Sequence, residues 1–460
     1  MIKKIIAFVL AVLLCAAALA ESVSLPVYVE GSIFGGKGDD KIELTLNFDP
    51  AWLTKGDNTL YNPELAEFCT LLSADVYFRE KDVARGTPNR VVVKGASEED
   101  YTFTTLLEEL GFSDARHIET YGGYDTDVND TVTLNIGVMH LSEGDVYAVA
   151  VRGCFSAGEW MSVFDVGADT DAYGEHTDWT DKAALKGISV AAKRAYDVIN
   201  EYINQNSEEE TPKFLLITGH SRGGAVSELL GGMFEGDAGV ISFTYTFSAS
   251  AVTTDASAQE LKTVFNVYPS DDFFGDVLPF SEETFYRCGT SVTLDISEDA
   301  ETMEAIALIK GRSDYLGVSA ELKAEYARLF GEKFTTRSAL YEDKTRTETF
   351  EDAEEAQSRY DGLAAFISAE TGFGLEEICA VEQVTDTENG YEVTLKYNDA
   401  AALYSLGKIL TYGASAYEIV ISVFKDDAEV IAIADFFMNN ASALSGGHLL
   451  VNSYALTRRR

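Results

Sequence analysis

The sequence has few of the residues on which zinc sites and disulfide scaffolds depend. There are five cysteines in 460 residues, and none of them forms a Cys-x-x-Cys pair or a Cys/His cluster with zinc spacing. This scarcity excludes a small disulfide-built fold and a zinc module. Downstream of the N-terminal segment, we expect Cys69, Cys154, Cys288 and Cys379 to be isolated buried thiols.

Positive charge is also scarce. Lys and Arg number 35 against 76 Asp and Glu, which gives a formal charge of −41. Nucleic acids and anionic membrane surfaces are recognised by basic patches, so the charge argues against both partners. Beyond the N-terminus there is no run of about 18 apolar residues, and no transmembrane segment is expected.

What the chain does have is a composition suited to a large core. The hydrophobic content of 46% excludes wholesale disorder. The length predicts two or three domains, or one large domain with an insertion.

The first 20 residues have the pattern of a secretory signal peptide. Lys3 and Lys4 precede an apolar stretch at 5–17, and Ala18-Leu19-Ala20 has the small-x-small form of a cleavage site. We therefore expect cleavage after Ala20 and export of the product. Lipid attachment at Cys15 is disfavoured, because Leu14 precedes it where a small residue is wanted.

Strand and helix patterns alternate through the first two thirds of the chain. Apolar positions with helical spacing occur at 63–78 and 188–203, and strand-like runs occur at Val132–Leu141, Val146–Gly153, Lys213–Gly219, Ile241–Ser248 and Thr263–Tyr268. This order predicts an α/β fold with a mostly parallel sheet covered by helices.

The predicted domain organisation has five parts. Residues 1–20 are the signal peptide, 21–60 a β-rich extension, and 61–290 the α/β core. Residues 291–427 change to acidic amphipathic helical patterns, with a strand at Gly390–Tyr397, and are expected to form a mainly helical insertion or cap. Residues 428–460 then complete the core.

The most informative motif is Gly219-His220-Ser221-Arg222-Gly223-Gly224. It follows the apolar strand 214–217 and precedes a helical pattern at 225–233. A G-x-S-x-G sequence between a strand and a helix is the context of a nucleophile elbow, in which a tight turn exposes the serine above the sheet. Ser221 is therefore the predicted nucleophile; the alternative is a glycine-rich turn without chemistry.

Chain order then selects a base. In a nucleophile-elbow protein the acid and the histidine follow the serine, in that order. Of five histidines, only His448 lies after Ser221 with room for an acid between them. We predict that His448 is the general base; otherwise it is a surface loop histidine.

The acid is expected in a loop just after a sheet strand. The strand 264–268 is followed by Pro269-Ser270-Asp271-Asp272, so Asp271 and Asp272 are both candidates and Asp276 is a more distant one. Such an acid would orient His448 and stabilise its imidazolium form. The alternative role is to cap a turn.

An oxyanion hole needs two preorganised N–H groups. The backbone N–H of Arg222, the residue after the nucleophile, is one candidate. The backbone N–H of Cys154, which follows the strand 146–153, is the other.

Taken together, these residues resemble the class 3 lipase family, the fungal-type triacylglycerol lipases and their bacterial relatives. The resemblance covers roughly Asn62 to Pro279 and the C-terminal segment around His448. It rests on motifs in the family's order: Arg152-Gly153-Cys154 with Trp160, Gly187-Ile188, Gly219 to Gly224, Thr246-Phe247-Ser248, Asn266 to Pro279, and His448 to Tyr454. The resemblance implies an α/β-hydrolase fold and aligns Asp272 with the acid.

The chain departs from the family pattern at several positions. Cys154 stands where Thr or Ser would help to form the oxyanion hole, and Arg222 stands where Leu is usual. Arg222 could bind an acidic group of a substrate or pair with an acid of the protein. The long separation of Asp272 and His448 indicates an added cap.

The sequence thus predicts an exported serine hydrolase of carboxylic esters. The catalytic residues are Ser221, Asp272 and His448, and the oxyanion donors are Arg222 and Cys154. No metal or cofactor is expected. The resemblance implies lipid or other acyl esters as substrates. The alternatives are a non-catalytic binding protein on the same fold, or a thioester or amide hydrolase with the same triad.

Overall fold

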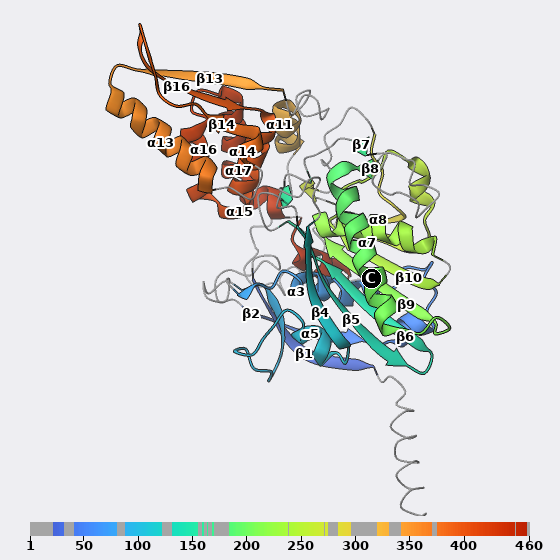
Figure 1. The fold of residues 1–460 in the computed structure, drawn as a ribbon. Coiled ribbons are helices and arrows are strands. Elements are labelled where there is room, and N and C mark those ends of the chain that lie inside the picture. Colours follow the sequence, from blue (N-terminus) through green and yellow to red (C-terminus); the bar gives the residue numbers. More distant parts are fainter. Residues whose placement is uncertain are drawn as a thin grey trace, which may run out of the picture.

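The computed structural model describes residues 22–31, 41–80, 88–121, 131–154, 159–160, 163, 168–169, 184–237, 239–270, 272–274, 284–295, 320–330, 342–369, 375–446 and 448–457. The signal peptide expected at 1–20, the acid candidates Asp271 and Asp276, and Pro279 lie outside these residues. The described elements are organised around three larger sheets (Figure 1).

The largest is a seven-stranded sheet with the order β12-β11-β10-β9-β6-β5-β4. From β6 to β12 neighbouring strands are parallel, whereas β4, β5 and β6 are antiparallel. The predicted mostly parallel sheet is therefore confirmed. Its strands are β4 (Ser113–Tyr121), β5 (Thr131–Leu141), β6 (Gly144–Val151), β9 (Lys213–His220), β10 (Val240–Phe247), β11 (Val264–Pro269) and β12 (Thr290–Leu294).

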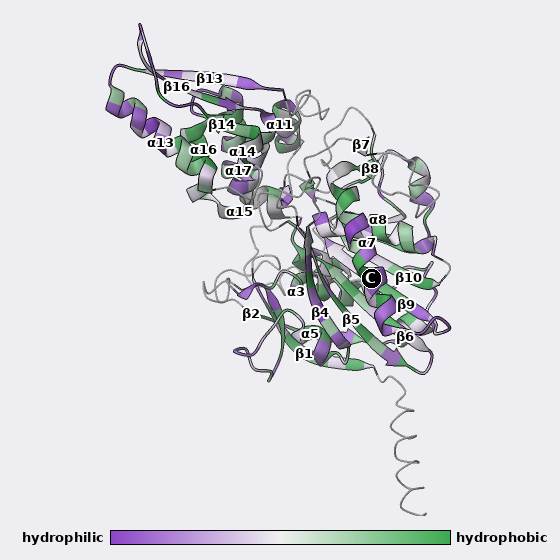
Figure 2. Ribbon diagram, in the orientation of Figure 1, coloured by the Kyte–Doolittle hydropathy of each residue, from purple (hydrophilic) through white to green (hydrophobic). Residues whose placement is uncertain are grey.

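Both faces of this sheet are buried, which explains why its central strands are nearly continuous apolar runs. Along β9, Leu215 and Ile217 face one core, while Phe214 and Leu216 face the other. Successive strand residues point to opposite faces, so each strand contributes to two hydrophobic layers. Hydrophobic residues are accordingly concentrated in the sheet and in the helices against it (Figure 2).

Helices cover the two faces. One face is covered by α7 (Lys186–Asn206) and α8 (Arg222–Glu235), and the other by α3 (Pro63–Asp75) and the C-terminal α18 (Leu450–Thr457) (Figure 1). The Asn62 side chain caps α3 by accepting from the Leu65 N–H at 3.1 Å, with Pro63 at the first helical position. None of the helices in the described ranges is both long and apolar enough to cross a bilayer.

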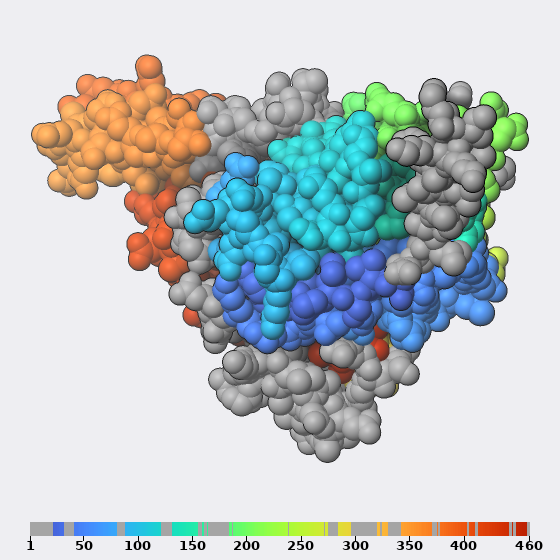
Figure 3. All heavy atoms as spheres, turned by 90° about the horizontal axis from the view of Figure 1, so that it is seen from below, coloured from blue at the N-terminus to red at the C-terminus, as the bar shows by residue number. Residues whose placement is uncertain are grey.

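A second sheet lies against α3. It has the order β2-β1-β3 and is antiparallel, with β1 (Val23–Glu30), β2 (Lys41–Phe48) and β3 (Arg90–Val93). Seen from below, its residues form a broad surface (Figure 3). The β-rich extension was expected at 21–60, but its third strand, β3, lies within 61–290, the range expected for the α/β core. A later segment of the chain therefore completes this sheet.

The elements from α11 to α17, here called the insertion, form a separate group at the upper left of Figure 1. They combine helices with a four-stranded antiparallel sheet, of which only the strand Gly390–Tyr397 was expected from the sequence. The elements are α11 (Ala320–Phe330), β13 (Lys344–Phe350), α13 (Ala353–Ala369), α14 (Leu375–Ile378), β14 (Cys379–Val381), β15 (Thr385–Thr387), β16 (Gly390–Tyr397), α15 (Asp399–Tyr412), α16 (Ala414–Val423) and α17 (Ala428–Gly446).

The insertion and the core meet at different residues from those expected. The strand β12, which begins at Thr290, pairs with β11 and belongs to the central sheet. The helix α17, expected in the core, packs against α15 and α16. The chain therefore returns from the insertion only after Gly446, just before His448.

Candidate active site

Ser221 occupies the sharp turn between β9 and α8. Its backbone has φ 58° and ψ −127°, outside the regions favoured by non-glycine residues. Its N–H donates to the Phe247 carbonyl at 2.9 Å, and its carbonyl accepts the first bond of α8 from Ala225 at 2.9 Å. These contacts hold a backbone conformation that costs of order 1–3 kcal/mol and that is typical of a nucleophile elbow.

The glycines around Ser221 permit close backbone packing. A Cβ atom on Gly219 would lie 2.3 Å from the Gly223 carbonyl oxygen, and one on Gly223 would lie 2.2 Å from the Val151 carbonyl oxygen. Both distances are below any real Cβ contact. The turn can therefore close at Gly219 and approach β6 at Gly223 only because these positions have no side chain.

Asp272 and His448 are brought together from opposite ends of the insertion. His448 Nδ1 lies 2.9 Å from Asp272 Oδ1, and the Asp272 carboxyl is fully buried. Asp272 follows β11, where its N–H donates to the Pro269 carbonyl at 3.0 Å. A carboxylate can only accept, so Nδ1 of His448 carries the proton and Nε2 of the neutral ring is an acceptor.

The Nε2 atom of His448 is buried and has no hydrogen-bond partner among the described residues. The His448 ring packs against the ring of His220, with centroids 4.8 Å apart, and His220 immediately precedes Ser221. Phe274 contacts the same ring at 5.0 Å. The structure thus places Asp272, His448 and the residue before Ser221 in one region.

The loop after β6 lies beside the elbow. Cys154 directs its thiol to the Glu159 carbonyl at 3.5 Å, and Glu159 forms a buried ion pair with Arg152 at 2.8 Å. The Thr131 hydroxyl donates to the same Glu159 carboxylate at 2.8 Å. The loop that carries the Cys154 N–H is therefore anchored by a buried charge pair together with the Thr131 hydroxyl.

The Arg222 side chain is buried and turns toward the start of β5. Its Nη1 donates to the Thr131 carbonyl at 3.1 Å. Its backbone N–H lies in the first turn of α8, where the helix dipole favours negative charge. The arginine side chain thus has a partner within the protein.

The other two described histidines have partners on β4, β5 and β6. His117 contacts Asn135 at 2.7 Å on β4 and β5, and His140 contacts Asp145 at 2.7 Å near the turn between β5 and β6. Within the described ranges, no group of three His, Cys, Asp or Glu side chains is arranged to hold a metal. None of Cys69, Cys154, Cys288 and Cys379 forms a disulfide there.

Two residues with contacts to this region were not predicted as site residues. His220 Nε2 lies 2.6 Å from the His448 carbonyl oxygen, and His220 Nδ1 lies 2.9 Å from the Tyr77 hydroxyl. Burial, together with the nearby His448, lowers the pKa of His220 to about 3. The position of His220 inside the motif was the one sequence signal that could have identified it.

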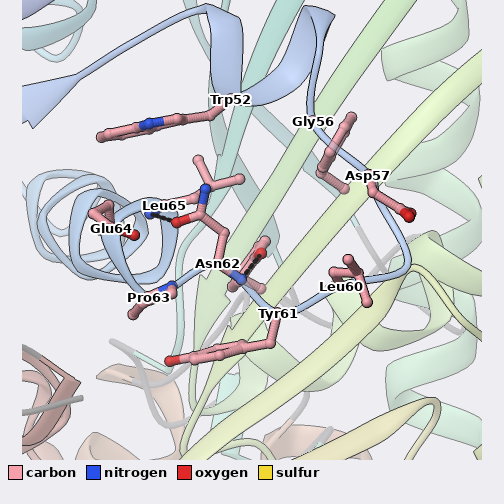
Figure 4. Close-up of a pocket in the computed structure, with 11 residues that line it drawn as sticks. Trp52, Gly56, Asp57, Leu60, Tyr61, Asn62, Pro63, Glu64 and Leu65 are labelled. Carbon is pink, nitrogen blue, oxygen red and sulfur yellow. Dashed lines mark hydrogen bonds between the residues drawn. The ribbon is translucent and has the colours of Figure 1, made fainter.

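A surface pocket of about 310 Å³ lies elsewhere, at the start of α3. Figure 4 shows Trp52 and Tyr61 on opposite sides of Asn62 and Leu65. None of the predicted site residues lines this pocket.

Residues 148–281 match the class 3 lipase family. The matched segment includes Cys154, Ser221 and Asp272, and the resemblance seen in the sequence is confirmed there. Among curated proteins, no sequence matches the chain.

Several lipases of known structure are similar in fold. A Rhizomucor miehei lipase with its propeptide is 16% identical, with 51% of this chain and 70% of that chain covered and a TM-score of 0.34. The Lip2 lipase of Yarrowia lipolytica is 13% identical over 50% and 77%, with a TM-score of 0.34. A variant of MDLA from Penicillium cyclopium is 19% identical over 52% and 83%, with a TM-score of 0.35.

The central sheet, its flanking helices and the elbow between β9 and α8 define the fold as that of an α/β-hydrolase. Within that fold, residues 148–281 have the class 3 lipase pattern.

Proposed function

We propose that the chain is an exported serine hydrolase of carboxylic esters that uses Ser221, His448 and Asp272. The observation that carries the proposal is the Asp272–His448 pair at 2.9 Å, held beside an elbow whose serine has φ 58°. A serine, a base and an orienting acid are the minimum set for nucleophilic acyl transfer.

In the proposed reaction, Ser221 Oγ attacks the ester carbonyl carbon while His448 Nε2 takes the hydroxyl proton. Asp272 keeps Nδ1 protonated and stabilises the imidazolium ion that forms. The tetrahedral intermediate then breaks its bond to the alcohol, and His448 returns the proton to that oxygen. Water, deprotonated by His448, attacks the acyl-enzyme and releases the acid and Ser221.

The negative oxygen of the intermediate needs donors that are fixed before the reaction. The proposed donors are the backbone N–H groups of Arg222 and Cys154. The buried Arg152–Glu159 pair at 2.8 Å supports this role, because it anchors the loop that carries Cys154. A backbone donor of this kind is worth about 3–4 kcal/mol of transition-state stabilisation.

The proposed substrates are lipid or other acyl esters. Two observations support this class: residues 148–281 match the class 3 lipase family, and the apolar ring of Phe274 packs against His448. Phe274 contacts both His448 and Trp160, with centroid distances of 5.0 and 5.7 Å. These rings offer an apolar approach to the base.

Export is the second part of the proposal. It rests on the pattern of residues 1–20 in the sequence. The full chain should be expressed in a bacterial host and the extracytoplasmic protein analysed by N-terminal sequencing. A mature start at Glu21 is expected; a protein retained in the cytoplasm with Met1 would contradict export.

The catalytic proposal is tested with a fluorophosphonate probe, which reacts only with activated serines. The protein from Glu21 onward should be labelled, Ser221→Ala should not be labelled, and His448→Ala should be labelled far more slowly. Absence of labelling in the folded wild-type protein would contradict the proposal and favour a binding protein on the same fold. A panel of ester, thioester and amide substrates then identifies the acyl chemistry.

A further inference from the structure

Two side chains and one main-chain carbonyl form a continuous series of hydrogen bonds beside Ser221. The Tyr77 hydroxyl, just after α3, lies 2.9 Å from His220 Nδ1. His220 Nε2, at the end of β9, lies 2.6 Å from the backbone carbonyl oxygen of His448. We call Tyr77 and His220 the relay residues.

The direction of each bond in the series follows from the chemistry. A carbonyl oxygen only accepts, so Nε2 of His220 carries a proton and donates to His448. Burial lowers the pKa of His220 to about 3, so its ring is neutral at pH 7 and Nδ1 is an acceptor. Burial raises the pKa of Tyr77 well above its ordinary value, so the hydroxyl keeps its proton and donates it to Nδ1.

The same hydroxyl also contacts the loop after β6 that contains Gly153 and Cys154, here called the oxyanion loop. The Tyr77 oxygen packs closely against the backbone of Gly153. A Cβ atom on Gly153 would lie 2.0 Å from the Tyr77 oxygen and 2.6 Å from the His220 carbonyl oxygen. Gly153 immediately precedes Cys154, so the series connects the backbone of the oxyanion loop to the backbone of the base.

The connection matters because it holds the main chain of His448. His448 lies in a short turn between α17 and α18, and its side chain is held through Nδ1 by Asp272. That bond fixes one edge of the ring but not the main chain. The His220 ring donates to that main chain, and His220 is the residue adjacent to the nucleophile.

We propose that Tyr77 and His220 are positioning residues that set the place of His448 relative to Ser221 and to the oxyanion loop. This inference rests on the proposed hydrolase function. The relay residues do not touch the substrate. His220 holds the backbone carbonyl of His448 by a hydrogen bond, and the Tyr77 hydroxyl packs against Gly153 of the oxyanion loop. Base, nucleophile and oxyanion donor are thereby held at fixed positions relative to one another.

A neutral His220 is also suited to this position. Its ring centroid lies 4.8 Å from that of His448, which becomes positively charged during the reaction. A second imidazolium at that distance would oppose the charge on His448. Donation from a neutral ring holds the carbonyl without that repulsion.

The first test compares Tyr77→Phe with Tyr202→Phe. Each substitution removes one buried hydroxyl, since Tyr202 of α7 donates to the Asp114 carbonyl at 2.8 Å. With a chromogenic ester, kcat of Tyr77→Phe should fall by about 10-fold to 100-fold with KM little changed, because small displacements of catalytic groups cost factors of this size. Tyr202→Phe should retain the wild-type kcat. Equal kcat values for Tyr77→Phe and the wild type would overturn the proposal.

The second test does not depend on activity. Long-range ¹H–¹⁵N NMR of the histidine rings reports the hydrogen bonding of each ring nitrogen. In Tyr77→Phe the Nδ1 of His220 loses its donor, so the Nδ1 resonance of His220 and the ring resonances of His448 should shift. Unchanged His448 resonances would overturn the proposal, even in a protein without esterase activity.

The two tests separate this inference from the proposed function. A wild-type protein that neither hydrolyses esters nor reacts with the probe contradicts the function, while a shifted His448 in Tyr77→Phe still supports the relay. An active wild type with unaffected Tyr77→Phe contradicts the relay alone. A His220→Gln variant adds a rescue measurement: its amide can donate to the His448 carbonyl, and it should retain more activity than His220→Ala.

Discussion

His448 Nδ1 lies 2.9 Å from Asp272 Oδ1, although 176 positions separate the two residues in the chain. Asp272 follows a strand of the central sheet, whereas His448 follows α17, the last helix of the insertion. The whole insertion is therefore enclosed between the acid and the base. The geometry of the pair depends on both ends of the insertion reaching the core correctly.

Replacement of Asp272 by asparagine should leave the fold intact and greatly reduce activity. The amide introduced by Asp272→Asn can donate to Nδ1 of His448, which would favour the tautomer with the proton on Nε2. In that tautomer Nε2 cannot accept the proton of Ser221. In the analogous triads this change costs about 10⁴-fold in kcat. The measurement is kcat on a chromogenic ester together with circular dichroism. A variant with wild-type kcat would show that Asp272 does not orient the base.

Gly219 should not tolerate a methyl group, whereas Gly362 should. A Cβ atom at Gly219 would lie 2.3 Å from a backbone carbonyl oxygen, so Gly219→Ala should lower the free energy of unfolding by about 1–3 kcal/mol and reduce probe labelling. Urea unfolding and labelling rates measure both effects.

The matched control is Gly362→Ala. Gly362 is exposed within α13, and its Cβ would meet nothing within 4 Å. Alanine in a helix interior is favoured over glycine, so this variant should gain roughly 0.5–1 kcal/mol and keep its activity. Equal effects at the two positions would contradict the packing described for the elbow.

The pH dependence of stability should include a contribution from Glu228. This residue lies on α8, is fully buried, and accepts from the Cys288 N–H at 3.0 Å. Burial raises its pKa to about 8, although the nearby Arg287 opposes the rise. The folded protein therefore keeps the proton between about pH 4.5 and pH 8, where the unfolded chain has lost it.

In that range the unfolded state binds fewer protons, so this group lowers stability as the pH rises. Glu228→Gln removes the titration and keeps an acceptor oxygen for Cys288. The variant should therefore gain stability relative to the wild type between about pH 5 and pH 8, by an amount on the order of a few kcal/mol. Urea unfolding at several pH values measures the difference. Parallel curves for the two proteins would contradict a protonated Glu228.

The insertion should affect catalysis through Tyr326. This buried residue of α11 contacts Phe273 at a centroid distance of 4.6 Å, and Phe273 is adjacent to Asp272. On its other side, Tyr326 contacts Phe436 of α17 at 5.8 Å. Tyr326→Ala should therefore reduce kcat, because it loosens the contact between the insertion and the loop that holds the acid.

The control for this prediction is Leu363→Ala on α13, which is buried within the insertion. Large-to-alanine substitutions of this kind cost about 2–5 kcal/mol. Both variants should unfold at lower urea concentration, but only Tyr326→Ala should lose activity under conditions where the protein is folded. Loss of activity in both would indicate a general effect of destabilisation.

The elbow could be predicted because it is local in sequence. The strand at 214–217, the glycines and the following helix are contiguous, so one motif indicates the turn and its serine. Asp272 and His448 were selected by chain order and by resemblance to a family. The relay could not be predicted, because its acceptor is the main-chain carbonyl of His448 and its donor Tyr77 lies 143 positions before His220.

The insertion was harder to predict for a different reason. Strand β13 has the sequence KTRTETF and is largely polar, with half-exposed and exposed positions. Such a strand lacks the alternation of apolar and polar residues from which strands are recognised. Its pairing with β16, from Lys344–Tyr397 to Phe350–Tyr391, is a long-range contact without a local signal.

The most direct test of the account is to trap the acyl-enzyme. The protein from Glu21 onward should be mixed rapidly with an activated acyl ester, quenched in acid, and analysed by intact mass and peptide mapping. We predict one acyl group per chain, located on Ser221, with none on Ser221→Ala and no accumulation in His448→Ala. Ester hydrolysis with no adduct on Ser221, or an adduct on another residue, would contradict the central claim.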